Sequence, residues 1–393
     1  MAKPFYLMRK NEIVTLVSIE ESGHIGRYSS DINEEIAPLQ SRYKPGWLKE
    51  WWADRAVPVT QKGIKDILKS QGLSVSTEYL VKNLGLSLTD YYWIKPLDSD
   101  LTWENVNLFD NDFKSNLNVS GQDEFSETGI PAFSPNSSIQ GDIEKSWCVK
   151  NGKRFIIKGN RTYLSAESIN EVIAGAVHKC LGYDNYTKYS LVRIENKEYN
   201  FGCMAKIFTS QDYELIPAYA IYTYKKKANN ISPFNHFMQT CSSLGADVDM
   251  LQSDMDHMIM TDFILSQYDR HLNNFGLLRD AGSLKITRLA PIYDSGACLF
   301  VNNETPGSEK ELLRIKINSF AENELSMLKY VKDKGIIDLT KLPPASFIKE
   351  SYGIDNKMDE KTINRIAYLY EKKIDICRRI QLGEDPMKNL YGI

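Results

Sequence analysis

The sequence of 393 residues lacks features that mark several common classes of protein. Its six cysteines form no Cys-x-x-Cys pair and no His/Cys cluster at zinc spacing, which argues against a disulfide framework and a structural zinc site. Residues 1–19 never build the apolar core of a signal peptide, and no later apolar stretch approaches the length of a membrane span. We therefore expect a soluble, cytoplasmic protein with reduced thiols.

An excess of charge of one sign is also missing. Lysine and arginine number 48 and aspartate and glutamate 51, so the formal net charge is −3. This balance gives no general electrostatic reason to bind nucleic acid or an anionic membrane, and no helix-turn-helix signal is present. The basic run at residues 225–227 is most simply interpreted as a solvated loop. We expect no direct nucleic-acid binding and no membrane association.

Length and composition predict a globular chain of two or three domain-sized units, because 42% of the residues are hydrophobic. Residues 1–112 contain five of the six tryptophans, which indicates a compact N-terminal subdomain, and we expect it to pack on the unit that follows. Residues 113–136, rich in small and polar side chains, predict a polar linker. Helical spacing of apolar residues predicts long helices over residues 248–267 and 359–380.

The most informative motif is Asp269-Arg-His-Leu-Asn-Asn274, followed by Pro-Ile-Tyr-Asp294. A hydroxyl that attacks a phosphate needs a carboxylate within hydrogen-bond reach, and Mg²⁺ prefers hard oxygen ligands. Asp269 fits the first role. The spacing of five positions selects Asn274 rather than Asn273 as a metal ligand, because protein kinases use that spacing. Asp294 then becomes the second ligand of a phosphoryl-transfer site.

The segments between these residues predict a hairpin. Residues 275–279 and 284–289 have the composition of two short strands around a turn, which would place Asp294 at a strand end. Plainer interpretations exist for each residue: Asp269 as a polar helix end, Asn274 as a turn former, Asp294 as the start of an Asp-Ser-Gly turn. The three together, in order around a hairpin, favour the functional interpretation.

Upstream, a predicted hairpin ends at Lys158. A lysine that closes an apolar strand needs a partner or solvent, and in a kinase the partner is the nucleotide phosphates; the alternative is a lysine whose ammonium reaches the solvent. Glu171, in a predicted helix over residues 169–180, would be its ion-pair partner. Ser168 and Glu171 also form a capping box, and Glu171 projects away from the apolar stripe of the helix, so a capping role is the alternative.

Two further segments are candidates for nucleotide contact. The small residues Ser138, Gly141 and Ser146 precede the hairpin, where backbone N–H groups could approach phosphate oxygens, although the segment matches neither a Walker A nor a Gly-x-Gly-x-x-Gly motif and a plain turn is the alternative. Residues 199–208 predict a strand that runs into a polar segment, the place at which a kinase-like fold passes between lobes. Backbone groups near Lys206 and Phe208 could then bind adenine.

Asp262, near the apolar face of the helix that precedes Asp269, also needs a partner. Arg270 is the nearest candidate, and a helix-surface acid is the alternative.

Taken in order, five motifs resemble those of HipA-type serine/threonine kinases over residues 137 to about 300. They are Ser138-Ile-Gln-Gly-Asp-Ile-Glu-Lys145, Phe155-Ile-Ile-Lys158, Asn170-Glu171, Asp269-Arg-His-Leu-Asn-Asn274 and Ile292-Tyr-Asp294. The resemblance implies an α+β, two-lobed, protein-kinase-like fold. Its mainly β small lobe would span residues 137–208, its mainly helical large lobe residues 209–393, and the N-terminal subdomain would be an addition.

The same resemblance implies the roles of the site residues. Asp269 would be the catalytic base, Asn274 and Asp294 would bind Mg²⁺, and Lys158 would contact the phosphates of ATP. Further residues of these motifs are expected at the nucleotide: Glu171, Ser138, Gly141, Lys145 and His271. In HipA kinases a serine just before the phosphate loop can be autophosphorylated and switch the enzyme off, and Ser138 occupies that place. Asp142 departs from the commoner Ala-Gly-Ala-Gln loop and adds a negative charge near the phosphates.

The expected activity is therefore ATP-dependent phosphorylation of serine or threonine, on the protein itself or on another protein, of the toxin type. The first 112 residues resemble single-chain HipA-like proteins rather than the usual HipA N-terminal subdomain, so an antitoxin is a candidate partner only. A phosphoinositide-type lipid kinase is an alternative, because Asp-Arg-His-x-x-Asn also occurs there. A catalytically silent, kinase-like binding protein is the second alternative.

Overall fold

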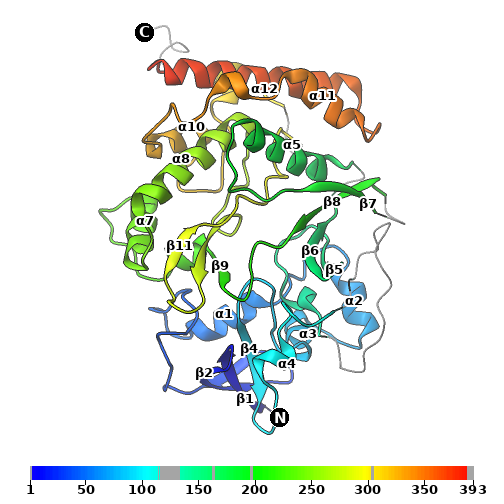
Figure 1. Cartoon of the computed structure of the whole chain (residues 1–393), viewed down its shortest axis with the longest axis vertical. Coiled ribbons are helices and arrows are strands. Elements are labelled where there is room, and N and C mark those ends of the chain that lie inside the picture. The colour runs from blue at the N-terminus through cyan, green and yellow to red at the C-terminus, as the bar shows by residue number, and fades with distance from the viewer. Residues whose placement is uncertain are drawn as a thin grey trace.

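The computed structural model describes residues 2–113, 115, 133–161, 164–194, 198–301 and 305–386. The chain begins with an antiparallel sheet in the order β3-β2-β1-β4, drawn in blue and cyan in the lower part of Figure 1. Its strands are β1 (Lys3–Arg9), β2 (Glu12–Ile19), β3 (Ile25–Tyr28) and β4 (Tyr92–Pro96). The helices of this N-terminal unit are α1 (Trp47–Arg55), α2 (Ile64–Ser70), α3 (Ser76–Lys82) and α4 (Trp103–Val106).

Tryptophan side chains fill the core of the N-terminal unit. Trp52 and Trp93 are completely buried. Gly85, at φ 67°, comes so close to Trp52 that a Cβ there would lie 2.5 Å from the indole ring, so this position requires glycine. Trp147 and Val149 of the next unit belong to the same buried cluster. The N-terminal unit therefore shares a hydrophobic core with the strand that follows it.

The small lobe is built on a sheet in the order β5-β6-β8-β7. Its strands are β5 (Lys145–Lys150), β6 (Lys153–Lys158), β7 (Ser190–Arg193) and β8 (Phe201–Lys206), and α5 (Ala166–Cys180) follows β6. Asn151 and Gly152 join β5 to β6 with φ values of 50° and 68°, the positive pair that an Asn-Gly hairpin turn favours. Helix α5 buries Ile169, Ile173 and Val177 at helical spacing.

A third sheet, in the order β11-β10-β9, belongs to the large lobe. Its strands are β9 (Tyr213–Pro217), β10 (Gly276–Asp280) and β11 (Ile286–Leu289). A buried charge cluster fastens it to the N-terminal unit, because Arg9 of β1 and Arg279 of β10 both donate to Glu214 Oε1, at 2.6 and 2.9 Å. Arg279 also donates to the Tyr92 hydroxyl at 3.1 Å.

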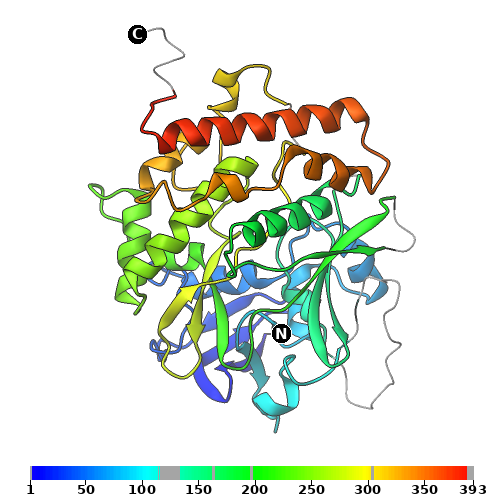
Figure 2. The same ribbon diagram turned by 45° about the horizontal axis from the view of Figure 1, so that its top comes forward.

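The large lobe is mainly helical. Helix α12 crosses the top of Figure 1 and, as the turned view in Figure 2 also shows, lies over α11 and α8. The α-helices of the lobe are α6 (Ala218–Tyr222), α7 (Pro233–Ser243), α8 (Val248–Leu265), α9 (Glu309–Leu312), α10 (Glu324–Met327), α11 (Ala345–Gly353) and α12 (Glu360–Gln381). The described residues also form the 3₁₀ helices η1 (Pro135–Ser138), η2 (Leu328–Tyr330) and η3 (Leu339–Lys341).

The α+β, two-lobed fold with an added N-terminal subdomain is confirmed, but one local prediction is wrong. Asp294 does not lie at a strand end: β11 stops at Leu289, since Pro291 has no N–H to continue the ladder, and Asp294 adopts φ 57°. The end of the predicted linker is structured, because η1 is buried and packs against α3. Residues 116–132 of that linker lie outside the described residues.

No helix among the described residues is long and apolar enough to span a bilayer.

A buried pair of histidines joins α5 to α8. His178 Nδ1 lies 3.0 Å from His257 Nε2, and the Tyr183 ring stacks on His257 with ring centroids 3.7 Å apart. Burial lowers the pKa of His257 from 6.5 to about 4. Burial, with smaller contributions from His257 and Arg270, lowers the pKa of His178 well below its ordinary value. Both imidazoles are therefore neutral in the folded protein near pH 7.

We predict that the free energy of unfolding falls as the pH drops from about 6.5 towards 4. In this range the unfolded chain takes up a proton at His257 and the folded chain does not, so protonation favours unfolding. The loss from His257 approaches about 3 kcal/mol at the acid end. Urea titrations at a series of pH values measure it. The His257→Phe variant should show a shallower dependence on pH, and equal slopes for the two proteins would contradict the assignment.

Candidate active site

A cavity of about 470 Å³ lies between residues of the small lobe and residues of the large lobe. Strand β6 brings Lys158 to it and α5 brings Glu171. The loop before β5, the start of β5 and the segments after α8 and β11 bring the other predicted residues. Side chains more than a hundred positions apart in the sequence therefore meet around one space. The predicted site residues that line it are Gly141, Lys145, Lys158, Glu171, Asp269, His271, Asn274 and Asp294.

A buried lysine between two carboxylates is the electrostatic centre of the cavity. Lys158 Nζ lies 2.7 Å from Glu171 Oε1 and 2.9 Å from Asp294 Oδ1. Burial alone would lower the pKa of Lys158, but Asp294 and Glu171 raise it well above its ordinary value. Burial would raise the pKa of Asp294, yet Lys145 and Lys158 hold it well below its usual range. Lys158 therefore stays protonated and Asp294 ionised.

Glu171 also contacts the segment that carries Asp294. Its Oε2 accepts a hydrogen bond from Ser295 N at 2.9 Å, so one carboxylate connects α5, β6 and the Asp294 segment. The capping alternative for Glu171 is wrong, because α5 begins at Ala166 and Glu171 lies within the helix. Glu171 lies off the apolar stripe of α5 because its side chain points towards Lys158.

Lys145 supplies a second positive charge at the start of β5. Its Nζ lies 3.8 Å from Asp294 Oδ2 and donates to Gln140 O at 3.0 Å. Burial lowers the pKa of Lys145. Gly141, at φ 98°, faces this ammonium, and a Cβ there would lie 2.5 Å from Nζ. The positive φ favours glycine at this position, and a larger residue would displace the Lys145 ammonium.

The segment that carries Asp269 is held by Arg270. The predicted ion pair is present, since Arg270 Nε lies 2.9 Å from Asp262 Oδ2. Arg270 also donates to Asn274 O at 2.8 Å, to Tyr293 O and to Ser295 Oγ at 3.0 Å. One buried guanidinium thus joins the Asp269 segment to the Asp294 segment.

The Asn274 side chain is oriented by the backbone beside the predicted base. Its Nδ2 donates to Asp269 O at 2.8 Å, which leaves the amide oxygen available as a ligand. That oxygen and the carboxylate of Asp294 are the hard donors that Mg²⁺ prefers, and Mg²⁺ usually completes its shell with water and substrate phosphates. The donor set at the cavity therefore fits Mg²⁺ bound together with a nucleotide.

Four residues that the sequence analysis named as candidates for nucleotide contact do not line the cavity: Ser138, Ser146, Lys206 and Phe208. Ser138 is buried and its Oγ donates to Leu86 O at 2.8 Å, so its hydroxyl faces the N-terminal unit. The side chain of Lys206 is exposed, and the Phe208 ring packs on Tyr293 with ring centroids 5.7 Å apart. A direct contact of Ser138 with nucleotide has no support in this conformation. The backbone contacts to adenine near Lys206 and Phe208 stay predictions.

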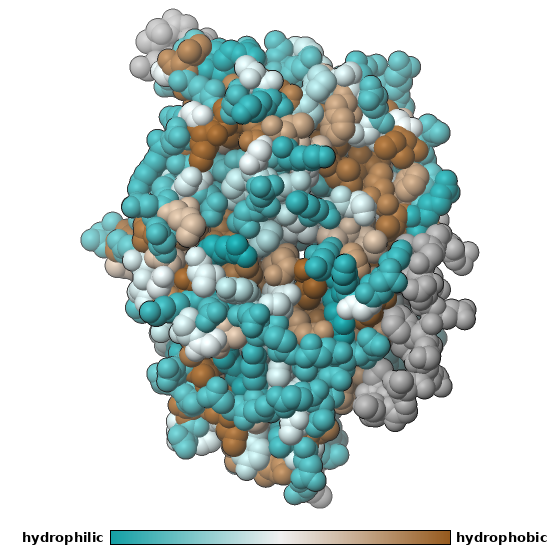
Figure 3. Space-filling model, in the orientation of Figure 1, coloured by the Kyte–Doolittle hydropathy of each residue, from teal (hydrophilic) through white to brown (hydrophobic). Residues whose placement is uncertain are grey.

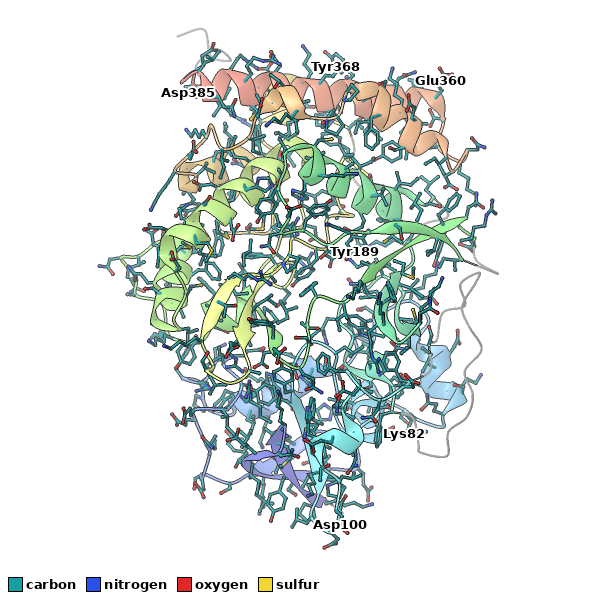
Figure 4. All side chains as sticks on the ribbon, viewed as in Figure 1. Lys82, Asp100, Tyr189, Glu360, Tyr368 and Asp385 are labelled. Atoms are coloured by element: carbon teal, nitrogen blue, oxygen red, sulfur yellow. The ribbon has the colours of Figure 1, made fainter. Side chains whose placement is uncertain are left out.

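Four residues that sequence reasoning did not assign complete the site. Gln267 Nε2 donates to Asp294 O at 2.8 Å, and Asn170 Nδ2 donates to Gly296 O and Cys298 O at 2.9 and 2.7 Å. The Tyr189 ring, labelled below α5 in Figure 4, lies 4.8 Å from Lys158 Nζ. Ser295 contacts both Glu171 and Arg270. Asn170 stands in the Asn170-Glu171 motif, although it had no assigned role, and Ser295 directly follows Asp294.

We expect Glu171→Gln to lower kcat/KM for MgATP by roughly 10- to 100-fold, the loss typical of a hydrogen bond between charged groups. Glutamine keeps the shape of the side chain but removes the charge that fixes Lys158. Steady-state kinetics at varied MgATP measure the effect. Glu350→Gln, at an exposed position of α11, is the control and should behave as wild type. Equal values for all three proteins would show that the pair does not serve the nucleotide.

Comparisons with known proteins bear on the fold. No protein-family model matches the sequence, and no curated protein matches it. Among solved structures, HipA of the Shewanella oneidensis MR-1 toxin–antitoxin system, determined with HipB and operator DNA, has a TM-score of 0.51 at 12% identity. The match covers 96% of this chain and 97% of that one. The similarity shows a HipA-like, two-lobed kinase fold.

Two other kinases match less well. The proinflammatory kinase CtkA of Helicobacter pylori has a TM-score of 0.44 at 19% identity and covers 62% of this chain and 97% of its own. A Golgi casein kinase has a TM-score of 0.28 at 13% identity, with 60% and 70% covered. The assignment of the fold rests on HipA alone.

Proposed function

We propose that this protein transfers the γ-phosphoryl group of ATP to a serine or threonine hydroxyl of a protein, itself included. A kinase-like fold does not by itself imply this chemistry, so the proposal rests on the site. The observation that carries it is the position of Lys158 between Glu171 and Asp294, at the cavity that Asp269 and Asn274 also line.

In the proposed reaction Asp269 accepts the proton of the attacking hydroxyl. The hydroxyl oxygen forms a bond to the γ-phosphorus, the bond from that phosphorus to the β–γ bridging oxygen breaks, and ADP leaves with the electron pair. Lys158, oriented by Glu171, binds phosphate oxygens. Lys145 adds positive charge at the same cavity, which favours a polyanionic substrate there. The protein thus acts mainly by positioning and by charge.

Asn274 and Asp294 are the residues that would hold Mg²⁺. When bound, Mg²⁺ neutralises charge on the phosphates and helps to orient them. The low pKa of Asp294 keeps its carboxylate in the form that a cation requires. Gln267, through Asp294 O, and Arg270, through Asn274 O, hold the backbone of both ligands in place.

The net charge of the chain and the face seen in Figure 3 support a protein acceptor over a lipid acceptor. The net charge of −3 gives no attraction to an anionic bilayer. Figure 3 shows a face on which hydrophilic residues dominate and hydrophobic ones gather in limited patches. Neither feature favours stable contact with a membrane surface.

The acceptor class is tested by offering both acceptors to the purified protein. Magnesium and γ-labelled ATP are added with a mixed protein substrate in one reaction and with phosphatidylinositol vesicles in another. We expect labelled phosphoserine or phosphothreonine after acid hydrolysis of the protein, and unlabelled lipid. Labelled lipid alone would replace the proposal with a lipid kinase. Binding of MgATP without any transfer would replace it with a silent binding protein.

A further inference from the structure

The segment between α1 and α2, residues 57–63, lies against the loop that precedes β5. None of its residues lines the cavity. Its Val57 and the first residue of α2, Ile64, are buried, whereas Val59 and Thr60 near its middle are exposed. We call residues 57–63 the bracing segment and residues 137–142 the phosphate loop.

Hydrogen bonds run from the bracing segment to both ends of the phosphate loop. Two come from its backbone, because Val57 N donates to Ser137 O at 2.9 Å and Lys62 N donates to Asp142 O at 3.0 Å. Two come from its side chains. Thr60 Oγ1 donates to Asp142 Oδ1 at 2.6 Å, and Gln61 Nε2 donates to Gly141 O at 3.0 Å.

The phosphate loop reaches back to the N-terminal unit through its own side chains. Gln140 Nε2 donates to Arg55 O and Ala56 O, at 3.1 and 3.2 Å, at the C-terminal end of α1. Ser138 Oγ donates to Leu86 O. These bonds join residues 52 to 85 positions apart in the sequence, so the N-terminal unit determines the conformation of the loop.

The bracing segment is itself firmly anchored. Arg55, the last residue of α1, makes a two-pronged ion pair with Asp90 at 2.6 and 2.7 Å and donates to Gly85 O at 2.7 Å. A loop that is held by an anchored segment is ordered before a ligand arrives. Binding then costs less conformational entropy than it would for a free loop.

The hydrogen bond from Thr60 also restrains the negative charge of Asp142. Asp142 lines the cavity, and its carboxylate would repel the phosphates of a nucleotide. The hydroxyl of Thr60 holds one carboxylate oxygen towards the N-terminal unit. A loop residue that opposes phosphate binding is thereby restrained from outside the cavity.

We propose that Thr60 and Gln61 are positioning residues for the phosphate loop and set the affinity for MgATP without touching it. The inference rests on the proposed function for its ligand. It assigns a role in that function to the N-terminal subdomain, which supplies no residue of the cavity wall.

The test uses the full chain with Thr60→Val, which keeps shape and removes the hydroxyl, and Gln61→Met, which removes the amide. Thr60→Ser restores the hydroxyl, and Val59→Thr, at a neighbouring position that is 60% exposed, is the control. Calorimetric titration with MgATP gives Kd, and steady-state kinetics give KM and kcat. Thermal unfolding reports on the fold.

We expect Kd and KM for MgATP to rise roughly 5- to 10-fold in Thr60→Val and Gln61→Met, the equivalent of one hydrogen bond, with kcat and the unfolding temperature nearly unchanged. Thr60→Ser and Val59→Thr should match wild type. In an Asp142→Ala background, Thr60→Val should add little, because its partner is gone. Unchanged Kd in both variants, while wild type binds MgATP, would overturn the inference.

Amide hydrogen exchange separates this inference from the proposed function. Lys62 N–H is bonded to Asp142 O, so its exchange should accelerate in Asp142→Ala if the Thr60 bond holds the loop in place. A wild-type protein that binds no MgATP would end the proposed function. In that case the exchange rate at Lys62 alone tests whether the bracing segment holds the phosphate loop, and an unchanged rate in Asp142→Ala would contradict this inference too.

Discussion

Replacing Asp269 with asparagine is expected to lower the rate of phosphoryl transfer by roughly 100- to 10,000-fold, the range that general-base catalysis contributes. Asparagine has nearly the same shape but cannot accept the proton of the acceptor hydroxyl. Asp269 is not proposed to bind ATP, so Kd for MgATP should stay within a few-fold of wild type. Single-turnover rates with saturating MgATP measure the loss directly.

Asn273→Ala is the matched control for this variant. Asn273 is exposed and does not line the cavity, whereas Asn274, one position on, lines it. The control should keep its rate within about twofold, the size of effect usual for exposed positions. Asn274→Ala should lose activity as a result of weakened Mg²⁺ binding. Undiminished transfer in Asp269→Asn would contradict the assignment of Asp269 as the base. Equal losses in Asn273→Ala and Asn274→Ala would contradict the assignment of Asn274, rather than Asn273, as the metal ligand.

Replacing Lys373 with methionine is expected to lower the free energy of unfolding by roughly 3–5 kcal/mol, the cost typical of leaving one charge of a buried pair without its partner. Lys373 of α12 is completely buried, donates to Glu324 of α10 and lies 3.8 Å from the centre of the Phe263 ring. Burial raises the pKa of Glu324 to about 7, against the effect of Lys373. Because Lys373 lowers this pKa, its removal raises the pKa of Glu324 further. The loss should therefore grow as the pH rises above 7, where the wild-type carboxylate is ionised beside Lys373 and the variant carboxylate has no cation beside it.

Urea unfolding followed by far-UV circular dichroism measures this loss. The six tryptophans all lie in residues 47–147, so their fluorescence does not report on the large lobe. The double variant Lys373→Met/Glu324→Leu should recover most of the stability, since an apolar pair removes both buried charges. A double variant as unstable as Lys373→Met would show that packing, rather than the charge left on Glu324, causes the loss.

Periodicity and order along the chain predicted most of the fold. The hairpin that ends at Lys158 is present. The helices α5, α8 and α12 each carry a local pattern, and each lies within a few residues of its predicted range. The pairing of Lys158 with Glu171 was also predicted, whereas the contact of Lys158 with Asp294 was not.

The parts that sequence did not predict depend on distant contacts. Ser138 is a small residue of the type and position expected in a phosphate loop, but only the folded chain shows that its hydroxyl points to Leu86. Lys373 lies among the apolar residues of α12, and no local pattern indicates that Glu324, 49 positions earlier, will neutralise it. The sequence likewise gives no sign of the hydrogen bonds from Thr60 and Gln61 to the phosphate loop.

The central claim is that this site moves a phosphoryl group from ATP to a protein hydroxyl. The most direct measurement is the incorporation of γ-labelled phosphate into protein by wild type, Asp269→Asn and Asp294→Asn in parallel, with magnesium and with a chelator. The account predicts magnesium-dependent phosphoserine or phosphothreonine in wild type, and little or none in either variant. No labelled protein from wild type, or equal labelling by all three, would contradict it.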